Sequence, residues 1–152
     1  MQVNVDRKLA FKIAGKGFTI KNREDVSEIR LSFLKEYKNI LKEHGAAYGL
    51  MEYNALEQNY NYFIGFEIAD KDTINQNDFI VYEVEESDYL EVPVESLDGL
   101  KEGYIYTYKE YFPNKKYFHG LGPDIEFYQY DQDNDSIASA KLFICLRENP
   151  HA

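Results

Sequence analysis

The fold class is decided by residues 24–69, which read EDVSEIRLSFLKEYKNILKEHGAAYGLMEYNALEQNYNYFIGFEIA. Apolar and aromatic side chains recur at steps of three and four residues from Val26 to His44. This spacing places them on one face of a helix. We therefore predict a helix from about Glu24 to His44, which Gly45 ends as a cap residue in the left-handed conformation.

Two strands are predicted after this helix, over residues 46–53 and 60–69, on either side of a polar stretch that contains Asn54 and Asn59. The polar stretch between them is typical of a hairpin connection. A strand is also predicted before the helix, over residues 8–20, where apolar residues alternate with polar or small ones. The first half of the chain therefore has the order strand, helix, strand, strand.

The second half repeats this order, with elements expected over residues 79–94, 96–112, 124–131 and 140–146. The first of these is one long strand, or two strands with a bend near Ser87 and Asp88. Two helices and six or more strands with short connections predict an α+β fold with an antiparallel sheet. We expect one domain over residues 1–152, with halves at about 8–70 and 79–147, joined within the polar residues 70–78.

The composition excludes several classes of function. The 152 residues include 17 basic and 27 acidic ones, a net charge of −10, which argues against binding to nucleic acid or to anionic membranes. No apolar stretch is long enough for a membrane span, and the polar start with a single cysteine predicts a reduced, cytoplasmic protein. The three histidines and Cys145 lack metal-ligand spacing, so we expect neither a metal nor another cofactor.

Aromatic residues are unusually frequent, with 14 Tyr and 10 Phe and no Trp. A core of this size does not need so many hydroxylated rings. Tyrosine has an apolar body and a polar tip, which suits ligand pockets and interfaces. The excess of tyrosine is therefore the first indication of a binding site.

The strand over residues 124–131 carries the main candidate residue. Alternation places Ile125 and Phe127 on one face, which we expect to pack against a helix, and Glu126 with Tyr128 on the other. A carboxylate between aromatic rings is poorly solvated, so it would attract a cation or act as an acid or base. The alternative is that Glu126 faces water on an open sheet. If the carboxylate is unpaired in a cleft, Glu126→Gln should preserve the fold and raise the melting temperature.

Other aromatic residues are candidates for the same site. They lie on predicted strands, or four residues apart on the second helix, at Tyr48, Tyr62, Phe66, Tyr104, Tyr108 and Phe143. Packing in the core is the alternative for each of them.

Three segments together resemble a known family. They are Tyr111-Phe112-Pro113 at the end of the second helix, Ile125-Glu126-Phe127-Tyr128 on a strand, and Lys141 to Leu146 on the last strand. They resemble the GyrI-like small-molecule-binding domain, also called the effector-binding domain of AraC-type and MerR-type regulators. The chain departs from the family pattern at Ile125, before the glutamate, and in the last strand, which lacks a proline.

This resemblance spans about residues 8–147 and implies an architecture. It implies two pseudo-symmetric strand-helix-strand-strand modules, of the kind called SHS2, with a central groove between them. It also implies that the groove takes a hydrophobic or cationic ligand and that Glu126 faces it. Because no helix-turn-helix precedes the domain here, we expect a standalone member of the family.

Three functions remain open at this point. The first is an effector-binding domain that holds a small molecule through Glu126 and the aromatic residues. The second is a hydrolase of cyclopropane-containing compounds, in which Glu126 and Tyr108 would be catalytic. The third is an acidic module that inhibits a partner protein. The identity of the ligand and the oligomeric state are not determined by the sequence.

Overall fold

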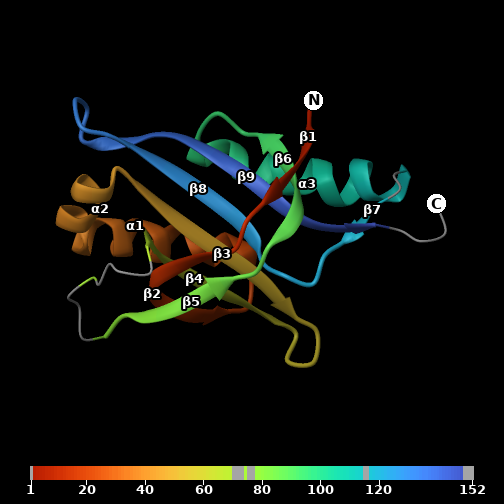
Figure 1. The fold of residues 1–152 in the computed structure, drawn as a ribbon, viewed down its shortest axis with the longest axis horizontal. Helices are drawn as coiled ribbons and strands as arrows, with labels where there is room; N and C mark the ends of the chain where they lie inside the picture. Colours follow the sequence, from red (N-terminus) through yellow and green to blue (C-terminus); the bar gives the residue numbers. More distant parts are fainter. Residues whose placement is uncertain (1, 70–73, 75–77, 115–116, 149–152) are drawn as a thin grey trace.

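The structure is a computed structural model that describes residues 2–69, 74, 78–114 and 117–148. Its strands are β1 Asn4–Lys8, β2 Phe11–Ile20, β3 Ala46–Asn54, β4 Asn59–Ile68, β5 Ile80–Val84, β6 Ser87–Pro93, β7 Tyr117–His119, β8 Asp124–Asp131 and β9 Ser136–Glu148. Its α-helices are α1 Val26–Glu36, α2 Lys38–His44 and α3 Leu100–Tyr106 (Figure 1). The predicted α+β class is confirmed.

One antiparallel sheet contains all nine strands in the order β1-β6-β9-β8-β3-β4-β2-β5, with β7 paired to β9. The six central strands form two mirrored groups of three, with β6-β9-β8 from the second half of the chain and β3-β4-β2 from the first. In each group the strand that comes first in the sequence lies outermost, and the strand that comes second lies at the centre of the sheet. The halves meet where β3 pairs with β8, and Gly49 lies opposite Glu126 at this junction. The strand-helix-strand-strand order is therefore present twice, with the two halves facing each other.

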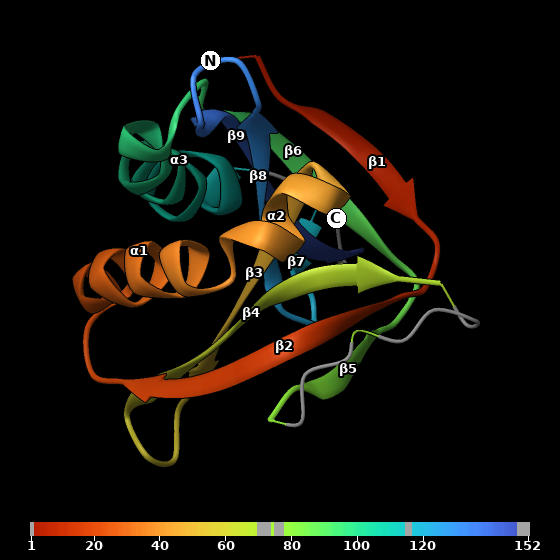
Figure 2. The ribbon, with the colours of Figure 1, turned by 90° about the vertical axis from the view of Figure 1, so that its left-hand side faces the viewer.

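The sheet is strongly curved because its two edges are joined by short connections. β1 lies at one end of the strand order and β2 near the other, yet only two residues separate them in the chain. The same holds for β5 and β6. Two residues span less than about 11 Å between flanking Cα atoms, so the edges must approach each other. Figure 2 shows the resulting curl, with α1 and α3 on its outer face.

The two faces of the sheet carry separate apolar cores. The face under the helices packs Phe33 of α1 and Leu100 of α3 against β-strand residues such as Tyr128. The opposite face, inside the curl, has a smaller cluster without helical residues that includes Ile125 and Phe143. The expectation that Ile125 and Phe127 pack against a helix is therefore wrong. The helices cover the face of Glu126 instead.

Several boundaries differ from the sequence prediction. The first predicted helix is broken at Tyr37 (φ −105°, ψ 33°) into α1 and α2, while Gly45 ends it with φ 77° as expected. The second continues after α3 as a π-helical turn over Thr107–Tyr111, in which the Thr107 hydroxyl donates to the Gly103 carbonyl at 2.8 Å. Such a bond offers the backbone an alternative to regular helix.

The strand prediction was incomplete at the edges. For the segment 79–94 the alternative of two strands is confirmed, because β5 and β6 are separated by Glu85 and Glu86, just before the predicted bend. β1 and β7 were missed, because both are short and β1 is polar and mostly exposed. The predicted junction at 70–78 lies largely outside the described residues.

Candidate functional site: a cavity between the two halves

A cavity of about 1460 Å³ lies on the outer face of the sheet, between α1 and α3. Its apolar and aromatic lining comes from both helices and from the strands beneath them, and includes Val26, Leu31, Leu34, Met51, Tyr53, Tyr60, Leu97, Leu100, Tyr104, Ile105, Tyr108 and Ile137. The cavity thus sits where the two pseudo-symmetric halves meet. Ligand pockets are commonly apolar hollows with a few convergent polar groups.

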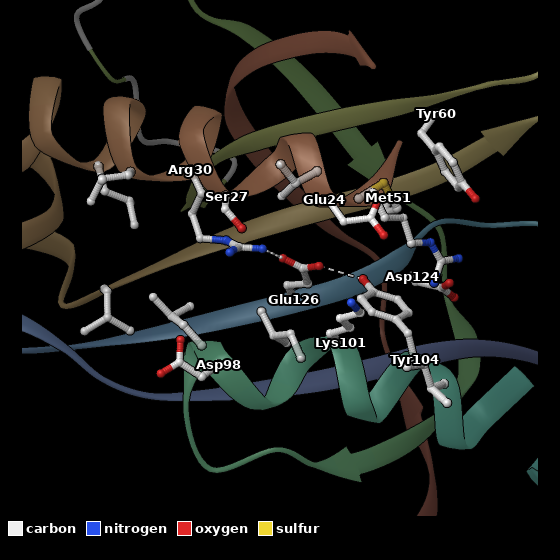
Figure 3. Close-up of a pocket in the computed structure, with 18 of the residues that line it drawn as sticks. Glu24, Ser27, Arg30, Met51, Tyr60, Asp98, Lys101, Tyr104, Asp124 and Glu126 are labelled. Atoms are coloured by element: carbon white, nitrogen blue, oxygen red, sulfur yellow. Dashed lines mark hydrogen bonds and ion pairs between the residues drawn. The ribbon is translucent and has the colours of Figure 1, made fainter. Parts of the chain in front are cut away.

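Glu126 of β8 lies in the floor of this cavity and is 1% exposed. Arg30 of α1 forms an ion pair with its Oε1 at 2.8 Å, and the Tyr104 hydroxyl of α3 donates to its Oε2 at 2.7 Å. Figure 3 shows the carboxylate held between the two helices by these contacts. Glu126 is therefore buried but paired, and the expectation of an unpaired carboxylate is wrong.

Two further tyrosines support this group from behind. Tyr128 donates its hydroxyl proton to Glu126 Oε1 and accepts a hydrogen bond from Arg30 Nε at 3.1 Å. Because Tyr128 has given its only proton to Glu126, the 2.8 Å contact with Tyr62 must be a donation from the Tyr62 hydroxyl. Both tyrosines are fully buried. Their hydroxyls lie over Gly49, where a Cβ atom would be 2.4 Å from the Tyr128 oxygen.

Burial and charge fix the protonation states of these groups. Burial, followed by the nearby charge of Glu126, raises the pKa values of Tyr104 and Tyr128 well above the usual range. Both therefore remain hydrogen-bond donors at neutral pH. Burial acts against the charge of Arg30, but Tyr128 and Glu126 outweigh it and raise the pKa of the guanidinium.

A second buried carboxylate lies two residues earlier on the same strand. Asp124 is 2% exposed and accepts three hydrogen bonds, from the Tyr108 hydroxyl at 2.6 Å, from His119 Nε2 at 2.8 Å and from the Cys145 backbone at 3.1 Å. Burial lowers the pKa of His119, but the hydrogen bond to Asp124 outweighs that effect and raises it overall. Asp124 thus closes the end of the cavity beside α3.

Arg23, just before α1, adds a cation to the same end of the cavity. Its guanidinium carbon lies 4.2 Å from the ring centroid of Tyr104, 5.1 Å from that of Tyr108 and 5.3 Å from that of Tyr60. Cation–π contacts of this kind stabilise the charge. Among the described residues, its buried Nε atom has no hydrogen-bond partner.

The structure brings together only part of the predicted site. Glu126, Tyr104 and Tyr108 line the cavity, whereas Tyr128 and Tyr62 hold the glutamate from beneath. The hydroxyl of Tyr108 donates to Asp124 and not to Glu126.

The remaining three candidates lie elsewhere. Tyr48 and Phe143 belong to the cluster inside the curl, where Tyr48 packs on Phe127. Phe66 packs against Phe33 of α1 in the core. Parity along a strand separates two faces, but it does not say which face or which end borders a cavity.

Sequence reasoning missed Arg30, Arg23, Asp124 and His119. Arg30 lies 96 residues before Glu126 in the sequence, so no local pattern connects them. A signal did exist, because Arg30 sits between the apolar positions Ile29 and Phe33 of the helical stripe. A basic residue that close to the buried face of a helix requires a buried acceptor.

Neither a metal site nor a membrane span was found in the part of the chain that the structure describes. No three His, Cys, Asp or Glu side chains there are grouped to hold a metal ion. None of the helices described is both long and apolar enough to cross a membrane.

The sequence model of one family, Cass2, described as integron-associated effector binding protein, matches residues 6–145. The chain belongs to this family. This confirms the resemblance to GyrI-like effector-binding domains that the second helix and the last two strands predicted. No curated protein matches the chain.

Solved structures share the fold of this chain at low identity. SAV2435 bound to tetraphenylphosphonium is 13% identical, with a TM-score of 0.67, and the match covers 99% of this chain and 97% of that one. The integron cassette protein VCH_CASS2 of Vibrio cholerae is 12% identical, with a TM-score of 0.64 and 95% of each chain covered. The C-terminal domain of EcmrR is 14% identical, with a TM-score of 0.64 and coverage of 97% and 98%.

Proposed function

We propose that this chain binds a hydrophobic, ring-bearing small molecule in the cavity between α1 and α3. The observation that carries the proposal is the cavity itself, whose volume of about 1460 Å³ exceeds the roughly 300–1,000 Å³ of typical ligand pockets. Tyrosine rings and aliphatic side chains of both halves surround it, and the buried carboxylate of Glu126 lies in its floor. A molecule held there would contact both halves at once.

Family membership supports this proposal, because the family is described as effector-binding. SAV2435, which has the same fold, is described as bound to tetraphenylphosphonium, a molecule of four phenyl rings. A bulky aromatic ligand would suit the aromatic lining of the cavity here as well.

Glu126 has a positioning role in this proposal. Its ion pair with Arg30 and its hydrogen bond from Tyr104 connect α1 to α3 across the floor. A ligand that replaces or strengthens one of these contacts would change how the two helices sit on the sheet. Binding could thereby be transmitted to the outer surface of both helices.

Hydrolysis and protein inhibition remain hypotheses from the sequence. A hydrolase would need Glu126 to take a proton from water, yet three of its roughly four acceptor positions are already filled by Arg30, Tyr104 and Tyr128. Product analysis of every bound compound tests that function separately.

The test is binding of Nile red, a neutral aromatic dye, followed by fluorescence. Ile105 of α3 lines the cavity, whereas Leu56 at the hairpin tip is 96% exposed and does not. We expect Ile105→Asp to weaken dye binding about tenfold or more, because the variant loses roughly 1.5–3 kcal/mol of apolar burial against the dye. The matched control Leu56→Asp should bind as wild type does. Equal affinity of all three proteins, or no binding to wild type, contradicts the proposal.

A further inference from the structure

The cavity is built on equivalent positions of the two halves. Val26 begins α1 and Leu100 begins α3, 74 residues later, and a 3₁₀ turn precedes each helix. Of the described residues 23–35, eight line the cavity, at positions 23, 24, 26, 27, 30, 31, 34 and 35. The residue that follows each of them by 74 positions lines the cavity as well. The walls of the cavity therefore repeat, once from each half.

The strands in the floor repeat in the same way. Tyr53 pairs with Tyr60 across β3 and β4, and Tyr130 pairs with Ile137 across β8 and β9. All four line the cavity. Because β3 and β8 are antiparallel and meet at Glu126, Tyr53 and Tyr130 lie four residues to either side of this centre. At about 3.3 Å per residue, the two pairs are roughly 26 Å apart along the strands.

The two helices start at opposite ends of this cavity. Arg23, just before α1, lies against the ring of Tyr108, in the turn that follows α3, so the helices run antiparallel. Figure 3 shows Tyr60 and Asp98 at opposite ends of the pocket, with Glu126 between them. The start of α1 thus shares one end with the end of α3, and the start of α3 shares the other end with the end of α1.

The end of the cavity at Tyr60 is lined by aromatic rings. Tyr60, Tyr104 and Tyr108 lie around the guanidinium of Arg23, with their ring centroids 4.2–5.3 Å from its central carbon. Tyr53 packs on Tyr60 with the two ring centroids 5.0 Å apart. Flat rings gain from stacked or edge-to-face contact with other rings, in addition to their burial. We call this group of side chains the aromatic end, and it suits a flat aromatic group.

The opposite end has a different lining on the same frame. Leu97, Ile137 and Leu34 occupy the positions that correspond to the guanidinium and to two of the tyrosines of the aromatic end. Tyr130 contributes a ring there, but it is only 6% exposed and its hydroxyl donates to Asp135. We call this group the aliphatic end. Branched aliphatic side chains offer apolar contact area without ring faces, so this end suits an aliphatic group.

We propose that the cavity binds one elongated molecule, with a flat aromatic group in the aromatic end and an aliphatic group in the aliphatic end. This inference rests on the proposed function. The volume of about 1460 Å³ exceeds what a single compact ligand usually occupies, and the two ends are far enough apart to hold two groups joined by a linker. The linker would pass over Glu126, whose contacts with both helices would stay in place.

The test uses three uncharged compounds built on tetraethylene glycol. The mixed compound carries a naphthylmethyl group at one end and a cyclohexylmethyl group at the other, and each single-group compound has a methyl ether in place of one of them. Calorimetry of the full chain should show the mixed compound binding at least about tenfold more tightly than the better single-group compound, because the linker makes the second contact intramolecular. A mixed compound with one ethylene glycol unit is too short to reach both ends and should lose this gain.

Two variants assign each group to its end. Tyr60→Ser should weaken the naphthyl compound severalfold and leave the cyclohexyl compound unchanged, whereas Ile137→Ser should do the reverse. Leu56→Ser is the matched control, because Leu56 is 96% exposed at the hairpin tip and does not line the cavity. It should bind all three compounds as wild type does. Melting curves establish that each variant is folded.

The outcomes separate the two proposals. If the mixed compound binds no more tightly than the better single-group compound, or if both variants weaken both single-group compounds equally, the inference of two unlike ends is overturned. It is also overturned if Nile red binds and none of the three compounds does, and in each of these cases Nile red binding leaves the small-molecule cavity standing. If neither Nile red nor any compound binds, both proposals fail. Should a variant not fold, wild type still decides, because a compound with two cyclohexylmethyl groups must bind more weakly than the mixed one.

Discussion

Replacing Glu126 with Gln should destabilise the protein, because it leaves the buried charge of Arg30 without a counter-ion. The change is nearly isosteric. The amide oxygen can still accept from Arg30 and Tyr128, and the amide nitrogen can donate to the oxygen of Tyr104 after its hydroxyl turns. What is lost is the negative charge beside a guanidinium whose residue is 9% exposed.

The magnitude follows from this geometry. Breaking a buried ion pair by removing one partner costs about 3–5 kcal/mol. Because Gln retains the hydrogen bonds, we expect the lower end, about 3 kcal/mol. For a chain of 152 residues each kcal/mol lowers the melting temperature by about 2–4 °C, so the expected decrease is roughly 6–12 °C.

The assay is thermal and urea unfolding of wild type, Glu126→Gln, Arg30→Met and the double variant. In the double variant both charges are absent, so it should be more stable than the sum of the single effects predicts, by about 0.5–3 kcal/mol. Tyr53→Phe, at a tyrosine that is 57% exposed, controls for surface changes. An unchanged or raised melting temperature for Glu126→Gln would refute the ion pair as a stabilising contact.

Three further predictions concern single residues. Gly49→Ala should lower the free energy of unfolding by about 1–3 kcal/mol, because its Cβ would lie 2.4 Å from a buried tyrosine oxygen. Gly17→Ala should leave it unchanged, because the nearest neighbour of its Cβ would lie at 3.7 Å. Urea unfolding of the two variants makes the comparison. The pKa of His119 is raised by its hydrogen bond to Asp124, so its contribution to stability is present below about pH 6.5 and is lost as pH rises through the raised value. Because the His119 side chain is 38% exposed, this contribution stays under about 1 kcal/mol. The melting temperatures of wild type and His119→Gln should differ more at low pH than at high pH. A difference that does not change with pH contradicts the assignment. Cys145 is 1% exposed and burial raises the pKa of its thiol, so Ellman's reagent should modify it far more slowly in the folded protein than in urea; equal rates would show that the strand opens readily.

Local patterns in the sequence determined most of the secondary structure. The helical stripe before Gly45 and the hairpin after it are set by side-chain period and by the cap, so they were predicted within a few residues. The same holds for β8, whose alternation correctly placed Glu126 and Tyr128 on one face. The break at Tyr37 and the short strands β1 and β7 were missed, because short or polar segments carry little periodic signal.

The site depended on information that no local pattern contains. Glu126 and Tyr104 were predicted because the family resemblance and helical spacing pointed to them, but the sequence did not reveal that Arg30 neutralises the glutamate. That contact joins residues 96 positions apart and exists only because β3 and β8 pair at the centre of the sheet. Charge complementarity across such a distance is decided when the two halves pack together.

The sequence by itself therefore determined the α+β class, the repeated order of elements and the two faces of each strand. Only the tertiary structure decided which face is covered by the helices, since this depends on the direction in which the sheet curls. Two-residue connections force the edges together and enclose Ile125 and Phe143 inside, which leaves Glu126 on the outer face beneath α1 and α3. The period of a strand is a local property, whereas the side on which a sheet closes is a property of the whole chain.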